Sequence, residues 1–182
     1  KLFQSNDEGR VNEIEEKILL DIHDEELRLI EADVLSENGD PRGELINLQY
    51  ELLFGPDRKE LHRRISDIKT ERPELVFRFD KGFKPKVHLK WWLGFVQSAR
   101  FTATTVEDIS RTLPFVGHPA FRFLESLTIE FAEGLNRKER QELFRTARLY
   151  LGGARRPKSL RTLVVGIPGE FEMTKNIYEA FP

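Results

Sequence analysis

Few residues of this chain have the types and spacing for chemistry, and the clearest pair is His23 beside Asp24. Adjacent His and Asp side chains can hold a metal ion, but such a site needs further His or Asp ligands at a fitting spacing. His62, His88 and His118 stand in no matching context. We therefore expect Asp24 to cap a helix, and we expect neither a metal nor any other cofactor.

Other patterns typical of catalytic residues are also incomplete. Glu15-Glu16 and Glu25-Glu26 are adjacent rather than spaced for one shared face, so they indicate solvated helix surface. Gly152-Gly153 lacks the Lys-Ser or Lys-Thr that follows the glycines of a phosphate-binding loop. No serine has the context of a nucleophile elbow, and the chain has no cysteine. The sequence therefore predicts that the protein is not an enzyme.

The most basic part of the chain, residues 134–162, has nine Lys or Arg against two Glu. Such a stretch can contact the phosphates of a nucleic acid. Phe144 and Tyr150 fit the buried side of a helix, which leaves no aromatic side chain among the exposed cations. We therefore favour a solvated face or an acidic protein partner, with nucleic-acid binding as the alternative. The candidate residues for that alternative are Arg137, Lys138, Arg145, Arg148, Arg155, Arg156 and Lys158.

A weak internal repeat lies in the second half of the chain. Apolar residues spaced i, i+3 and i+5 begin at Val96, Leu124 and Leu160, each in a strand-like run, and helical patterns follow the first two runs. One such unit cannot cover its own apolar face and must stack on a neighbour. The repeat predicts an α/β fold in which residues 96–182 form a short β/α solenoid of leucine-rich-repeat type. We treat this array as open, with further repeats able to follow residue 182.

Polar positions lie between the apolar residues of these three runs. Parallel strands of a repeat array present such positions on one side, where a partner protein can bind. The sequence therefore predicts a non-catalytic protein–protein interaction or scaffold module, with no membrane partner. The candidate partner-binding residues are Gln97, Ser98, Arg100, Glu125, Thr128, Glu130 and Arg161.

The first third of the chain has the pattern of four helices joined by short loops. Gly39 fits a helix end, Asp40 a cap and Pro41 the first turn of the next helix. Gly55 ends that helix, and Pro56 opens a fourth. We expect a helical module over residues 1–72 and an irregular aromatic joint over residues 73–95.

The segment from Ala32 and Asp33 through residues 38–49, Asn-Gly-Asp-Pro-Arg-Gly-Glu-Leu-Ile-Asn-Leu-Gln, resembles the signature of the bacterial repeat-companion domain. Val34 stands where that family has Trp. The resemblance implies a bacterial protein with a helical module in front of a repeat array, and it implies no reaction. From the residues themselves we expect a corner between two helices held by polar groups. The motif residues are Asp33, Gly39, Asp40, Pro41, Arg42, Gly43 and Glu44.

Length and charge agree with this division. The chain has 182 residues and 39% apolar content, enough for one compact domain, and lacks a long apolar run that could span a membrane. Its net charge of −2 conceals −9 over residues 1–50 and +7 over the remainder. The lack of cysteine fits a reducing compartment, so we expect a cytoplasmic protein.

Overall fold

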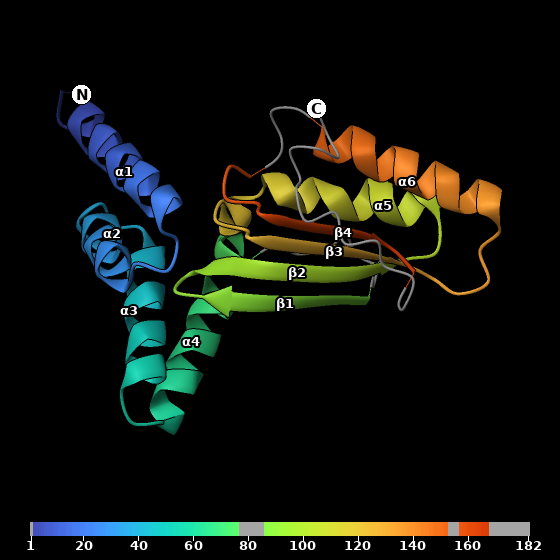
Figure 1. The fold of residues 1–182 in the computed structure, drawn as a ribbon. Helices are drawn as coiled ribbons and strands as arrows, with labels where there is room; N and C mark the ends of the chain where they lie inside the picture. Colours follow the sequence, from blue (N-terminus) through green and yellow to red (C-terminus); the bar gives the residue numbers. More distant parts are fainter. Residues whose placement is uncertain (1, 77–85, 153–156, 168–182) are drawn as a thin grey trace. The chain divides into compact units, whose positions relative to one another are not determined.

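A computed structural model describes residues 2–76, 86–152 and 157–167. This part of the chain has six α-helices and a four-stranded sheet, as the predicted α/β class requires (Figure 1). The chain divides into two compact units. The helical unit comprises Lys1–Phe77 and Trp92–Gly94, and the sheet unit comprises Arg78–Trp91 and Phe95–Pro182. Among the described residues, no helix has the length and apolar character needed to cross a membrane.

The helical unit contains the four predicted helices, and each one contacts the next along the chain. The fourth begins at Lys59 rather than at Pro56, because Arg58 keeps an extended backbone in front of it. A short 3-10 helix, Pro73–Leu75, follows. The α-helices are α1 (Leu2–Leu20), α2 (Glu25–Glu37), α3 (Pro41–Phe54) and α4 (Lys59–Glu71).

The turn between α2 and α3 follows the predicted roles of its residues. Gly39 has a φ of 72°, a left-handed conformation that glycine adopts without strain. The carboxylate of Asp40 accepts the backbone N–H of Arg42 at 2.8 Å and caps α3, with Pro41 in its first turn. A Cβ atom at Gly43 would collide with the backbone carbonyl of Ala32. The glycine therefore lets α3 approach α2 closely.

The predicted irregular joint is wrong for Lys86–Trp92, which form strand β1. Its half-buried residues Val87, Leu89 and Trp91 alternate with exposed ones, but the adjacent Trp92 hides this period of two in the sequence. Leu93 and Gly94 follow in a two-residue turn with φ values of 37° and 82°, the conformation of a β-hairpin turn. Residues 77–85 of the predicted joint lie outside the described residues.

The sheet unit has strands in the order β1-β2-β3-β4, and β2, β3 and β4 are parallel. Two helices, α5 (Val106–Thr112) and α6 (Arg137–Leu151), connect the parallel strands and lie side by side on one face of the sheet (Figure 1). Two 3-10 helices, Leu113–Gly117 and Pro119–Phe121, follow α5. Among the described strands, the sheet is open and not curled (Figure 1). The strands are β2 (Phe95–Ala103), β3 (Ser126–Phe131) and β4 (Thr162–Gly166).

The sequence repeat coincides with the register of these strands. Ala99 pairs with Leu127 and Leu127 with Leu163, while Phe101, Ile129 and Val165 form the next row. The apolar side chains of both rows form the side of the sheet that the helices cover, and all but Val165 are buried. The three apolar runs therefore occupy equivalent places in the fold.

Candidate protein-interaction surface

The seven predicted partner-binding residues all belong to the sheet unit. Ser98 and Arg100 of β2, and Thr128 and Glu130 of β3, alternate along their strands with buried residues. Since successive side chains of a strand point to opposite faces, these four lie on the face away from α5 and α6. Gln97, Glu125 and Arg161 have the opposite parity and form a row near the starts of the strands. We call the surface made by the four strand residues and this row the outward face.

One charge pair of the outward face joins β2 to β3. The guanidinium Nε of Arg100 lies 3.6 Å from a carboxylate oxygen of Glu130. The Arg100 side chain is 60% exposed, whereas that of Glu130 is 17% exposed. Such a partly exposed pair contributes little to stability, about 0–1 kcal/mol. It does fix a positive and a negative group side by side on neighbouring strands.

A second group joins the starts of all three parallel strands. Gln97, Glu125 and Arg161 occupy the same position in the three repeats, one residue after the first apolar residue of each run. The amide of Gln97 donates to the Glu125 carboxylate at 3.4 Å, and the Arg161 guanidinium lies 3.9 Å from the same carboxylate. Backbone bonds of 2.9 Å from Glu125 to Gln97 and from Arg161 to Glu125 hold the row together. The strand register thus unites residues that are 28 and 36 positions apart.

The predicted nucleic-acid residues lie elsewhere. Arg137, Lys138, Arg145 and Arg148 are exposed on α6, and Lys158 is exposed before β4. Arg155 and Arg156 lie outside the described residues. A capping box begins α6: the Asn136 side chain accepts two backbone N–H groups, and its own N–H donates to Glu139 at 2.8 Å.

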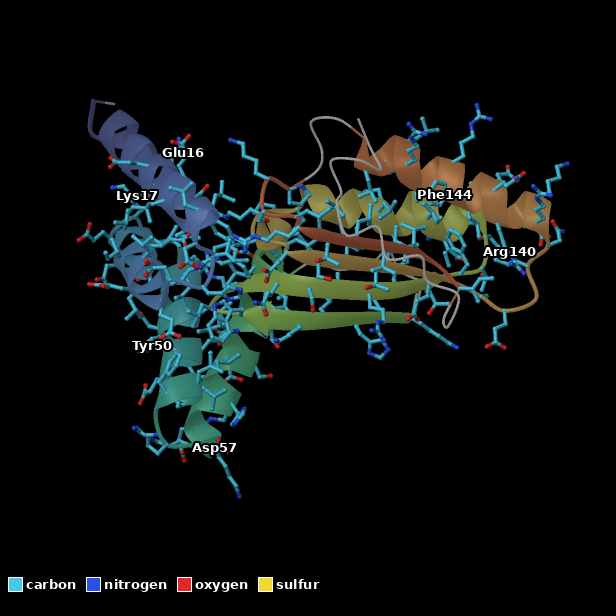
Figure 2. All side chains as sticks on the ribbon, viewed as in Figure 1. Glu16, Lys17, Tyr50, Asp57, Arg140 and Phe144 are labelled. Carbon is cyan, nitrogen blue, oxygen red and sulfur yellow. The ribbon has the colours of Figure 1, made fainter. Side chains whose placement is uncertain are left out.

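The prediction that Phe144 faces the buried side of its helix is wrong. Its side chain is 46% exposed, because the buried stripe of α6 consists of Leu143, Ala147 and Leu151. Figure 2 shows Phe144 on α6, one turn after Arg140. An exposed aromatic side chain therefore does lie among the basic residues. A cavity of about 430 Å³ adjoins it, lined by Phe131, Arg140, Gln141, Phe144, Arg145, Arg148, Gly166 and Ile167.

Sequence reasoning missed a buried charge cluster in the helical unit. Arg28 and Glu31 of α2 form an ion pair of 3.0 Å and are each 1% exposed, and Arg42 of α3 is 4% exposed. Burial raises the pKa of Glu31, while the positive charges of Arg28 and Arg42 act in the opposite direction. The only signal in the sequence was the place of Arg28 and Glu31 on the apolar side of a predicted helix.

The motif around Arg42 therefore has a structural role. Arg42 is buried, and burial lowers the pKa of its guanidinium group. The negative charges of Asp40 and Glu31 raise this pKa by a smaller amount. Glu44 instead faces α4, where it accepts two bonds from Arg64 at 2.7 and 3.0 Å. Asp33 is exposed. The polar corner that the motif predicts is present, with Arg28 and Glu31 as additional members.

The His23-Asp24 pair has the predicted local role. The Asp24 carboxylate accepts the backbone N–H of Leu27 at 2.9 Å and caps α2, while His23 is exposed. Within the described ranges, no group of three or more His, Asp or Glu side chains is arranged to hold a metal ion.

Comparisons with protein-family models, with curated proteins and with solved structures found no match to this chain. The resemblance to the repeat-companion domain therefore stays a prediction that rests on residues 32–49.

Proposed function

We propose that this protein is a non-catalytic interaction module that binds a partner protein on the outward face of β2, β3 and β4. The observation that carries the proposal is the placement of Ser98, Arg100, Thr128 and Glu130 on one face of β2 and β3. A row of three further polar side chains, Gln97, Glu125 and Arg161, lies near the starts of the three parallel strands. The helices α5 and α6 lie on the other face of the sheet (Figure 1).

The charge pattern of the outward face supports recognition of a protein. Arg100 and Glu130 alternate in sign across neighbouring strands, as do Glu125 and Arg161. A surface of mixed charge selects a partner of complementary pattern more than it adds raw affinity. Because strands hold these residues on a fixed backbone, little backbone conformational entropy is lost when a partner binds.

We also propose that β2, α5, β3, α6 and β4 form a short array of leucine-rich-repeat type. The coincidence of sequence repeat, strand register and connecting helices supports it. Curvature in such arrays accumulates through a small rotation per repeat, so three strands develop little of it. The segment similar to the repeat-companion signature supports the same proposal, since that signature precedes repeat arrays. The lack of cysteine favours a cytoplasmic location.

Charge reversal tests the proposed function. Arg100→Glu and Arg161→Glu each place two carboxylates side by side on the outward face, since their present partners are Glu130 and Glu125. We expect each variant to lose at least about tenfold in capture of partner proteins from a lysate of the source organism. The thermal unfolding midpoint should stay within a few °C of the wild type, because partly exposed ion pairs contribute only about 0–1 kcal/mol. If both variants captured the same proteins as the wild type, the outward face would be ruled out as the partner-binding surface.

A further inference from the structure

The cavity beside α6 combines apolar and cationic groups. Phe131 is buried at the end of β3, Phe144 is 46% exposed, and Ile167 is half-buried after β4. Arg140, Arg145 and Arg148 line the same cavity. The cavity volume of about 430 Å³ falls within the range of ligand pockets, about 300–1,000 Å³. The cavity can therefore hold one or two side chains of a ligand.

Among the described residues, two of the three arginines have no acidic partner. Arg140 is engaged, since its Nε donates to the backbone carbonyl of Leu135 at 2.8 Å. For Arg145 and Arg148, no hydrogen bond or ion pair exists within the part of the chain that the structure describes. On the outward face, by contrast, Arg100 and Arg161 both face glutamates. The cavity therefore has positive charge available for a ligand.

The helix aligns these groups. Arg140, Phe144 and Arg148 follow one another at intervals of four residues, so they lie along one side of α6, with Arg145 next to Phe144. Leu149, which is 72% exposed, extends the apolar area of the same helix. A ligand that lies along α6 would meet cations on both sides of an aromatic ring.

We propose that this α6 cavity binds an acidic peptide segment that carries an aromatic or aliphatic anchor. Guanidinium groups bind carboxylates through paired hydrogen bonds, which suits Arg145 and Arg148 to glutamate or aspartate side chains. The anchor would contact Phe144, Phe131 and Ile167. This site is separate from the outward face, because α6 covers the opposite face of the sheet (Figure 1).

The geometry favours a peptide over a nucleic acid. A phosphate backbone needs a long row of cations, but Arg137 and Lys138 do not line the cavity. Glu139 and Glu142 interrupt the basic residues of α6 and repel phosphate. The lining instead combines three arginines with Phe131, Phe144 and Ile167, which suits carboxylates beside one apolar side chain.

The test uses fluorescence anisotropy with a labelled synthetic peptide of alternating Glu and Phe and the whole chain. We expect binding that weakens at least about tenfold when every Glu of the peptide is replaced by Gln. Arg145→Glu and Arg148→Glu should each weaken binding of the Glu peptide at least about tenfold, and Phe144→Ala should weaken it severalfold. Arg137→Glu is the matched control on the same helix and should change binding less than about twofold.

Several results would overturn the proposal. Equal binding of the Glu and Gln peptides, no binding of either, or an equal loss in the control variant would each do so. Tighter binding of oligothymidylate, with affinity that falls steeply with salt, would assign the cavity to nucleic acid. Self-association of the chain that Arg148→Glu abolishes, measured by analytical ultracentrifugation, would assign the cavity to a second copy of the chain.

Circular dichroism provides the folding control. Because Arg145 and Arg148 are exposed, their variants should fold as the wild type does. Loss of folding in both Arg145→Gln and Arg148→Gln would give these residues a structural role instead.

Discussion

The helical unit and the sheet unit differ in where they place their charges. Among the described residues, the buried charged side chains are Arg28, Glu31 and Arg42, all in the helical unit. The sheet unit has an apolar core that includes Phe101, Phe115 and Phe121, and its described charges stay at least partly exposed. The difference teaches that charge belongs to the core of the first unit and stays at the surface of the second, where we propose that it binds a partner.

Physical chemistry explains why these roles separate. A buried charge is stable only with its partners in place, so its removal disrupts the fold. A partly exposed pair such as Arg100 and Glu130 changes stability less, by about 0–1 kcal/mol. Charge changes in the two units should therefore have opposite consequences for stability and for binding.

The largest effect on stability should come from Glu31→Ala. This change leaves Arg28 and Arg42 buried without their shared carboxylate, which should cost about 3–5 kcal/mol of unfolding free energy. Urea titration followed by far-ultraviolet circular dichroism measures the loss. As a control, Arg28→Met combined with Glu31→Leu removes both charges and should cost less than the single change. A larger loss in the double variant would refute a structural role for the ion pair itself.

Gly43→Ala should have the next largest effect. The new Cβ would collide with the Ala32 carbonyl, a backbone atom that cannot rotate away, so α3 must shift from α2. We expect a loss of about 1–3 kcal/mol, typical of overpacking. Gly9→Ala in α1 is the matched control, because its Cβ meets nothing within 4 Å and should stabilise the helix by about 0.5–1 kcal/mol. Similar results for both variants would contradict the close approach of the helices.

A smaller and pH-dependent effect should come from Asp108→Ala in the sheet unit. Partial burial raises the pKa of Asp108, but hydrogen bonds from Thr104 and Thr105 outweigh it and hold the pKa below its ordinary value. Asp108 is the N3 residue of the capping box that begins α5, with Thr105 as the N-cap, so the variant should lose about 1 kcal/mol at pH 7. Because the pKa of Asp108 is lower in the folded state, its ionised carboxylate stabilises the fold at pH values above the unfolded-state pKa of about 3.9. This stabilisation is lost as the pH falls through the folded-state pKa. Stability differences that persist unchanged at pH 2 would contradict this account.

The smallest effect on stability should come from exchanging Arg100 and Glu130. The double variant Arg100→Glu/Glu130→Arg keeps an ion pair between β2 and β3 and reverses its direction. We expect the unfolding free energy to change by less than about 0.5 kcal/mol in the same urea titration. A loss above about 2 kcal/mol would give this pair a structural role and remove the contrast between the two units.

The sequence predicted local features better than features that depend on tertiary structure. The caps at Asp24 and Asp40 and the turn at Gly39 were predictable because each depends on neighbouring residues. The strand repeat was also visible, since each apolar run occupies an equivalent place. The pairing of Glu125 with Arg161 was not, because it depends on strand register across 36 residues. The exposure of Phe144 was also missed, because helix rotation is set by packing of its neighbours.

Affinity capture with exchanged charges on the outward face tests the central claim most directly. The baits are the wild-type chain, a variant with Arg100/Glu130 and Glu125/Arg161 both exchanged, and Lys59→Glu as a control in the helical unit. Quantitative mass spectrometry then compares the proteins retained from a lysate of the source organism. We predict at least one protein that the wild type and the control retain equally and the exchanged variant retains at least about tenfold less. Equal retention by all three baits, or no specific protein on the wild type, would contradict a partner-binding role for this face.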